Sequence, residues 1–264
     1  MDLNRALAFM KKAAFDAGSQ LCKMQLQSRK LASRKDFLTD ADLMSEGIIL
    51  RTLASEYPDI PALSEEKGGK EITDGYLWVI DPVDGTINFF LQDDHWGISI
   101  ALVENGRTIA GVVYLPARHE MFSALCSGFA WLRRARSPEV PINVNKNFHL
   151  SDSQFWVGWG KEEHGGDDHR RVYKVIQKLD RRTLYPQIRN SATADMMAVA
   201  RGRISGYVFP KPEPFDIAAA ALIVVRAGGV ATDMEGNPWG PFSRSLVVSN
   251  GAIHHVLLDV LQHG

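Results

Sequence analysis

Residues 78–90 read Trp78-Val-Ile-Asp-Pro-Val-Asp-Gly-Thr-Ile-Asn-Phe-Phe90, and this stretch decides how the first half of the chain folds. The apolar, β-rich run from Tyr76 to Ile80 predicts a buried strand. Pro82 lacks a backbone donor and favours extended geometry in the residue before it, so we expect the strand to end at Asp81. Asp84-Gly85 then predicts a turn, and Thr86 can open a helical turn.

The same stretch places two carboxylates on one turn. Asp81 and Asp84 lie three residues apart, and the helical turn that follows leaves backbone amides free. Carboxylate oxygens bind hard cations and such amides bind phosphate oxygens, so the pattern favours a cation site that holds a phosphate. The Asp-Gly pair alone would favour an ordinary turn after a strand. The full Asp-Pro-Val-Asp-Gly-Thr run is more specific.

Composition limits the class of protein. The chain has 264 residues, of which 45% are hydrophobic and 23% charged, as in ordinary globular proteins. The net charge of −1 gives no broad attraction to nucleic acid or anionic lipid, so neither is expected as a partner. Cys22 and Cys126 are isolated, which argues against a disulfide framework or a zinc site. Residues 1–26 carry too many charges for a signal peptide or membrane span, and we expect a cytoplasmic protein.

Helix and strand patterns divide the chain into two halves, residues 1–140 and 141–264. In the first half, apolar residues at alternating steps of three and four predict a long amphipathic helix. The segment Glu104-Asn105-Gly106 predicts a tight hairpin turn. We expect two helices against a largely antiparallel sheet, with helices over residues 7–24 and 42–57 and strands over 62–64, 76–80, 97–103, 108–114 and 120–125.

The second half alternates between strands and helices, which is typical of an α/β fold. Residues 133–150 are expected to form a loop, and Trp156 and Trp159 are interpreted as sheet or interface residues. The two halves are expected to pack as one compact unit. Strands are predicted over 155–159, 207–210, 230–232 and 246–249, and helices over 169–179, 192–200, 217–227 and 253–261.

Four carboxylates fall at the ends of expected elements, where side chains can face a cleft. Glu65 follows one strand, Asp81 and Asp84 follow another, and Asp216 precedes the most apolar helix. Asp216 also fits an ordinary N-cap, and the two roles are compatible because a helix N-terminus favours nearby anions. Ligands that are all oxygen favour Mg²⁺ over zinc.

Short motifs follow one another along the chain: Lys35-Asp36-Phe37-Leu38-Thr39-Asp40-Ala41-Asp42, Ser64-Glu65-Glu66, Asp81 to Asn88, Asn190-Ser191-Ala192, Phe215-Asp216-Ile217-Ala218-Ala219 and Gly228-Gly229. In this order and at these spacings, they resemble the motifs of the inositol monophosphatase family of Mg²⁺-dependent, lithium-sensitive phosphatases. The resemblance covers nearly the whole chain. It implies an α/β fold in the form of a layered α-β-α-β-α sandwich, like that of inositol monophosphatases and fructose bisphosphatases.

The resemblance also implies a set of site residues. Two or three Mg²⁺ ions would be bound by Glu65, Asp81, the Val83 carbonyl, Asp84 and Asp216. Catalysis would depend on Glu65, on Thr86 as the hydrogen-bond partner of the attacking water, and on Asp42 as the acidic partner of Thr86. Phosphate and substrate contacts would come from Val83, Asp84, Gly85, Thr86, Asn190, Ser191, Ala192, Phe209 and Asp216.

The activity that the resemblance implies is hydrolysis of a small polyol or sugar phosphate by metal-activated water, in a homodimer. Alternatives are a relative acting on histidinol phosphate, fructose bisphosphate or a 3′-phosphonucleotide, or a regulatory binding protein. Inositol-selective relatives carry a glutamate seven residues before the aspartate of the second signature, where this chain has Phe209. This departure favours a broad substrate range or a leaving group with an apolar or aromatic part.

Overall fold

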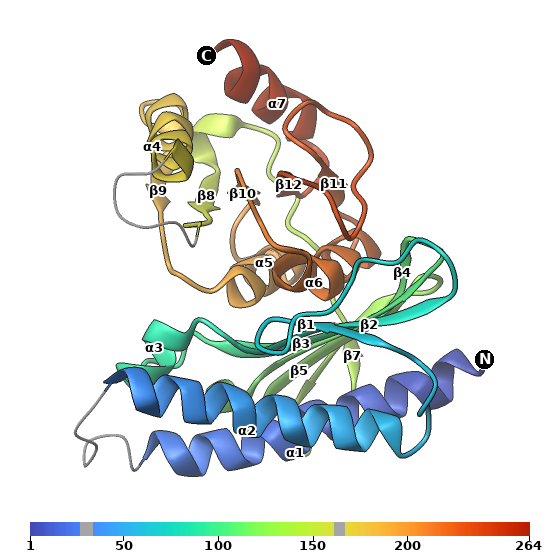
Figure 1. The fold of residues 1–264 in the computed structure, drawn as a ribbon. Helices are drawn as coiled ribbons and strands as arrows, with labels where there is room; N and C mark the ends of the chain where they lie inside the picture. Colours follow the sequence, from blue (N-terminus) through green and yellow to red (C-terminus); the bar gives the residue numbers. More distant parts are fainter. Residues whose placement is uncertain (27–33, 161–166) are drawn as a thin grey trace.

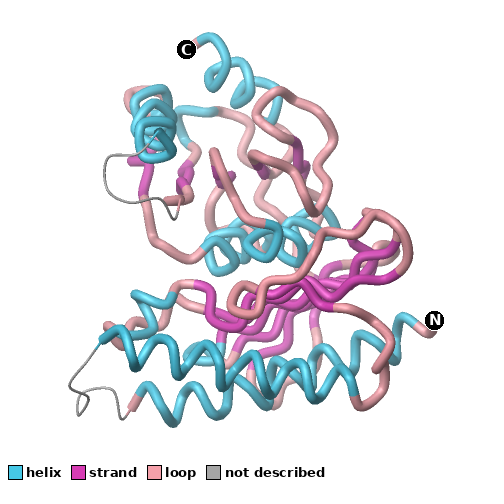
Figure 2. Tube along the Cα trace, viewed as in Figure 1, coloured by secondary structure: helices cyan, strands magenta, loops and turns pink. Residues whose placement is uncertain are grey.

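The computed structural model describes residues 1–26, 34–160 and 167–264. Helices and sheets alternate in layers, as Figure 1 shows by element and Figure 2 by secondary-structure type. The helix pair α1 (Leu3–Gln25) and α2 (Arg34–Ala54) covers one face of a first sheet. The pair α5 (Ala192–Ala200) and α6 (Pro214–Arg226) separates that sheet from a second one, whose far face carries α4 (Asp167–Leu179) and α7 (His254–His263). The expected α-β-α-β-α sandwich is confirmed.

The outer helix pair follows its sequence signals with one exception. The side chain of Asp2 accepts hydrogen bonds from the amides of Asn4 and Arg5 and so caps α1. The apolar stripe of α1 is buried. The prediction of α2 over residues 42–57 is wrong at both ends, because the helix begins at Arg34 and ends at Ala54. Its first turns are rich in charged residues and show no apolar stripe, so periodicity did not reveal them.

The first sheet has seven strands in sequence order: β1 (Ala62–Ser64), β2 (Tyr76–Asp84), β3 (Gly97–Glu104), β4 (Arg107–Leu115), β5 (Glu120–Leu125), β6 (Ala130–Arg134) and β7 (Val140–Pro141). Only the β1–β2 pair is parallel. The hairpin turn between β3 and β4 is confirmed, with positive φ at Asn105 and Gly106. The loop expected over residues 133–150 is wrong at its start, because β6 and β7 extend the sheet there.

The strand β2 does not end at Asp81 as expected. It continues to Asp84, and its register with β3 shifts between these two residues. Such an irregularity lets a strand accept Pro82, whose missing N–H would otherwise interrupt the ladder. The shift sets the directions of the two aspartates at the end of the strand.

The second sheet has the order β11-β12-β10-β8-β9, with β8 (Gln154–Val157), β9 (Leu184–Gln187), β10 (Gly206–Phe209), β11 (Val230–Thr232) and β12 (Leu246–Ser249). The strands β9, β8 and β10 are parallel, so their carboxyl ends meet at one edge. The strand β9 was not predicted, because it is short, largely exposed and interrupted by Pro186. The predicted strand over 155–159 ends at Val157, which leaves Trp159 beyond the sheet.

The middle layer explains the composition of α6. Residues 216–224 of this helix are all buried, because it packs against both sheets. The approach is close: a Cβ on Gly111 of β4 would lie 2.8 Å from the Ala219 carbonyl oxygen. The N-terminus of α6 is thereby fixed between the sheets. None of the helices in the described part of the chain has the length and apolar character needed to cross a membrane.

Candidate active site

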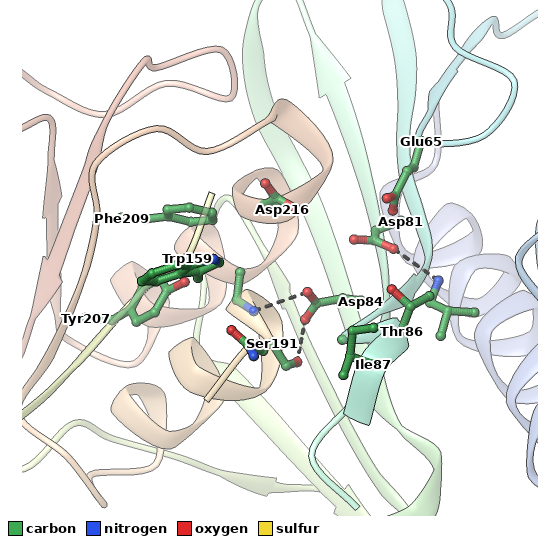
Figure 3. A pocket seen from close by; sticks show the side chains of 15 residues that line it. Glu65, Asp81, Asp84, Thr86, Ile87, Trp159, Ser191, Tyr207, Phe209 and Asp216 are labelled. Carbon is green, nitrogen blue, oxygen red and sulfur yellow. Dashed lines mark hydrogen bonds between the residues drawn. The ribbon is translucent and has the colours of Figure 1, made fainter. Parts of the chain in front are cut away.

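A cavity of about 320 Å³ lies between the end of β2 and the carboxyl ends of β8 and β10 (Figure 3). It is lined by Glu65, Asp81, Val83, Asp84, Gly85, Thr86, Ile87, Gly158, Trp159, Asn190, Ser191, Ala192, Tyr207, Phe209 and Asp216. Eleven of the twelve residues expected in the site are in this list. The exception is Asp42, which is buried on α2. That helix contacts α3 (Thr86–Phe90), the short helix that begins at Thr86.

The turn after β2 is built for close packing. The Asp81 Oδ1 atom accepts a hydrogen bond from the Val83 amide at 3.0 Å, which holds the carboxylate over the irregular strand. Gly85 has a φ of 84°, and a Cβ there would lie 3.0 Å from the Cβ of Ser191. A side chain at Gly85 would therefore be strained in backbone and in space. The glycine lets the turn after β2 lie against the loop before α5.

Asp84 is buried, and α5 supplies most of its hydrogen bonds. Its Oδ2 accepts from the Ser191 hydroxyl at 2.5 Å and from the Thr193 amide at 2.8 Å. The Thr193 hydroxyl donates to the same atom. Burial raises the pKa of Asp84, these hydrogen bonds oppose the rise, and the charge of Glu65 adds to it. Thr193 was missed in the sequence, although it is the second residue of a helix whose start had been located.

Asp216 belongs to the same cluster and also caps its helix. Its Oδ2 accepts from the Glu213 amide at 2.7 Å. The expected N-cap position is wrong, because Glu213 is the N-cap and Asp216 is the third helical residue, which completes a capping box. Ligand oxygens of Asp81, Asp84 and Asp216 all lie within 4.8 Å of one another, and the three residues are buried. Like charges this close inside a protein repel strongly unless a cation or protons neutralise them. Three hard oxygen donors fit Mg²⁺.

Glu65 lines the cavity but stands outside this group of three, and it is half-buried. Its amide donates to the Ile80 carbonyl at 3.3 Å, and Ser64 and Gly68 exchange backbone hydrogen bonds across the loop that carries it. Beneath the loop, the fully buried carboxylate of Glu46 on α2 accepts from the Ser64 hydroxyl and from the Lys67 amide. Glu46 therefore ties the Glu65 loop to the helix layer.

Ser64→Ala is expected to lower the free energy of unfolding by about 1–3 kcal/mol, because a buried carboxylate loses one of its donors. Chemical denaturation of the wild type and the variant measures the difference. Ser55→Ala is the matched control, because the Ser55 hydroxyl also makes one hydrogen bond, to the Thr52 carbonyl, but on the surface. Equal stability changes in the two variants would contradict the role of Ser64.

Behind Asp84, the buried residues His95 and Asp195 brace α5. Arg118 Nη2 lies 3.0 Å from His95 Nδ1, and an arginine can only donate, so Nδ1 is the acceptor. His95 Nε2 therefore carries the proton and donates to Asp195 Oδ1 at 2.6 Å. Burial, with the nearby arginines, lowers the pKa of His95 to about 3, and burial with the charge of Asp84 raises that of Asp195. No local sequence pattern reveals this pair, because its members are a hundred residues apart.

The remaining expected residues lie where the sequence placed them. Thr86, Val83, Asn190 and Ala192 all line the cavity. In the first motif, the side chains of residues 35–39 lie outside the described part of the structure. Four further lining residues were not expected: Ile87, Gly158, Trp159 and Tyr207. The interpretation of Trp159 as a sheet or interface residue is wrong, and the parallel pairing of β8 with β10, which brings Trp159 near Phe209, gives the reason.

Comparisons with known proteins agree on one family. The model of the inositol monophosphatase family matches residues 2–263. The chain is 33% identical to "Nus factor SuhB" of Xylella fastidiosa, over 97% of this chain and 94% of that protein. It is 32% identical to "Inositol-1-monophosphatase" of Rhizobium meliloti, over 97% and 96%. The solved structure of an inositol monophosphatase from Anabaena superposes with a TM-score of 0.83 at 29% identity, over 99% of this chain and 96% of that chain.

Proposed function

Because the chain belongs to the inositol monophosphatase family, we propose that it is a Mg²⁺-dependent phosphomonoesterase acting on a small phosphorylated metabolite. The observation that carries the proposal is the group of three buried carboxylates, with Glu65 in the same cavity. Family membership supports a phosphatase, and the oxygen-only donor set supports Mg²⁺. When bound, Mg²⁺ supplies positive charge next to the phosphate and makes a water molecule easier to deprotonate.

Each residue of the site has a proposed role. The metal would be bound by the carboxylates of Asp81, Asp84, Asp216 and Glu65 and by the Val83 carbonyl. The amides of Gly85 and Thr86 hold the phosphate oxygens and so fix the phosphorus for attack, because phosphoryl transfer depends mainly on positioning and charge neutralisation. The substrate alcohol lies on the other side of the cavity, against residues 190–192 and Phe209.

The proposed proton path runs through Thr86 and Asp42. The Thr86 hydroxyl accepts a proton from the attacking water and passes its own proton to the carboxylate of Asp42. Support comes from position: Thr86 is the first residue of α3 and lines the cavity, and α2, which carries Asp42, contacts α3. The Ser45 hydroxyl on the same helix donates to the Pro82 carbonyl at 2.7 Å, which fixes α2 against the site.

A second candidate function is regulatory binding, since one of the similar proteins is named a Nus factor. The complete set of carboxylates in this chain favours catalysis, because a phosphatase of this family would use them to hold Mg²⁺ next to the phosphate. A homodimer, a cytoplasmic location and the division into residues 1–140 and 141–264 remain predictions. The proposed boundary falls within β7.

A phosphate-release screen tests the proposed function. The purified chain is incubated with Mg²⁺ and with polyol, sugar, histidinol and nucleotide monophosphates, and inorganic phosphate is measured. We expect release from at least one class, at a rate that scales with enzyme concentration. If no class is hydrolysed faster than in the absence of protein, the enzyme proposal is wrong and the regulatory function gains support.

Lithium is expected to inhibit the reaction. A small monovalent cation fits an all-oxygen site but carries too little charge to stabilise a leaving alkoxide as Mg²⁺ does. The measurement is the phosphate-release rate at fixed Mg²⁺ and increasing LiCl, with NaCl at equal ionic strength as the control. Equal rates in the two salts would contradict the prediction.

A further inference from the structure

The wall of the cavity opposite Glu65, Asp81 and Asp84 is aromatic. Figure 3 shows Trp159, Tyr207 and Phe209 on one side, facing Glu65, Asp81 and Asp84 across the space. Tyr207 and Phe209 lie on β10, and Trp159 follows the end of β8, its parallel neighbour. A phosphate held at the carboxylate side would therefore direct its leaving group towards these rings.

The position of Phe209 is fixed by a glycine. A Cβ on Gly158 would lie 2.5 Å from the Phe209 ring and 2.5 Å from the Tyr207 hydroxyl, so only a glycine lets both rings pack against this strand end. The two rings also meet edge to face, with centroids 5.9 Å apart and an interplanar angle of 72°. Phe209 is therefore held as a rigid part of the wall.

Trp159 is held from behind by α4. Its ring stacks on His169 with centroids 4.3 Å apart and an interplanar angle of 25°. It also packs edge to face with Tyr173, with ring centroids 5.6 Å apart. His169 is buried, whereas Trp159 is only half-buried and lines the cavity. The indole is thus oriented before any ligand arrives, and a ligand that stacks on it need not immobilise it.

We propose that this aromatic wall binds a planar aromatic ring in the leaving group, so that the preferred substrates are phosphate esters of alcohols carrying a nucleobase, an imidazole or a similar ring. The inference rests on the proposed phosphatase activity and narrows its substrate class. A planar ring gains stacking contacts with Trp159 and Phe209. A polyol ring would instead bring several hydroxyls against carbon, and among the side chains of this wall the one hydrogen-bond acceptor is the Tyr207 hydroxyl.

The test compares two probe substrates, 2-phenylethyl phosphate and inositol 1-phosphate, on the wild type and on Trp159→Ala. The wild type is expected to prefer 2-phenylethyl phosphate in kcat/KM. Trp159→Ala should lower kcat/KM for that ester about 10- to 100-fold, the loss typical of one stacking aromatic. The value for inositol 1-phosphate should change less than about threefold. Trp159→Phe, which keeps an aromatic face, should retain most of the wild-type kcat/KM for 2-phenylethyl phosphate.

Phe129→Ala is the control, because Phe129 is an exposed aromatic residue outside this cavity and should leave both substrates unaffected. The proposed role of the aromatic wall would be overturned if the wild type preferred inositol 1-phosphate, or if Trp159→Ala lowered kcat/KM equally for both esters. Neither result would contradict the phosphatase activity. If Trp159→Ala does not fold, the substrate preference of the wild type and the kcat/KM values of Trp159→Phe still test the proposal. Absence of hydrolysis of every phosphate in the screen would instead overturn the phosphatase proposal itself.

Discussion

Asp216→Asn is expected to lower kcat/KM at least 10³-fold without lowering the melting temperature of the metal-free protein. The activity loss follows from removing one carboxylate of the proposed metal site, since a bound metal contributes several kcal/mol of charge stabilisation and each 1.36 kcal/mol is tenfold in rate. The stability of the metal-free protein, by contrast, is not expected to fall. Asp216 stands in a buried group of like charges, and an asparagine removes repulsion while its side-chain oxygen can still accept from the Glu213 amide.

Two measurements check this prediction, phosphate-release kinetics and thermal denaturation with and without Mg²⁺. The wild type should gain stability from Mg²⁺, since a ligand bound only to the native state stabilises it, and the variant should gain much less. Asp259→Asn on the exposed face of α7 is the matched control and should behave as the wild type. A metal-free Asp216→Asn that melts far below the wild type would show that the carboxylate is needed for the fold.

Thr86→Ala and Asp42→Asn are each expected to lower kcat by about 10²–10⁴-fold, the range for loss of a general acid or base. Neither residue is proposed to bind the metal, so the Mg²⁺-induced increase in melting temperature should be kept in both variants. Because the two side chains would pass one proton in sequence, the double variant should be little worse than either single one. Steady-state kinetics of the four proteins measure this.

Additive losses would contradict the shared role and would mean that the residues act separately. Thr52→Ala is a useful control, because Thr52 is a threonine like Thr86 but lies on α2, twelve residues before the end of β1 in the sequence. Thr52 does not line the cavity. Its kcat should match that of the wild type. If Thr86→Ala alone lost its response to Mg²⁺, Thr86 would belong to the metal site and not to the proton path.

Most of the fold and the carboxylate cluster could be predicted from the sequence because their signals are local. The stripe of α1, the Asn105-Gly106 turn and the apolar run of α6 each lie within a few turns or residues of chain. The resemblance of the motifs to the inositol monophosphatase family then implied that Glu65, Asp84 and Asp216 share one site, and all three line one cavity although they lie far apart in the sequence. Strong short patterns of this kind can be recognised without knowledge of tertiary contacts.

What the sequence did not reveal depends on tertiary contacts. Pro82 signals a strand end locally, but pairing with β3 carries β2 on to Asp84 through a register shift. The bond between His95 and Asp195 joins residues on different elements, and no local pattern predicts it. Trp159 became a cavity residue only because β8 and β10 are parallel neighbours. In each case the partner across the fold, and not the local run, decides the role.

The dependence of phosphate release on free Mg²⁺ tests the central claim most directly. Protein stripped of metal is assayed with its best substrate while Mg²⁺ is titrated from excess chelator to saturation. We expect no release above background in chelator and a saturable rise as Mg²⁺ binds among the clustered carboxylates. Release at the full rate in excess chelator would contradict the claim that Asp81, Asp84 and Asp216 serve catalysis by holding a divalent cation.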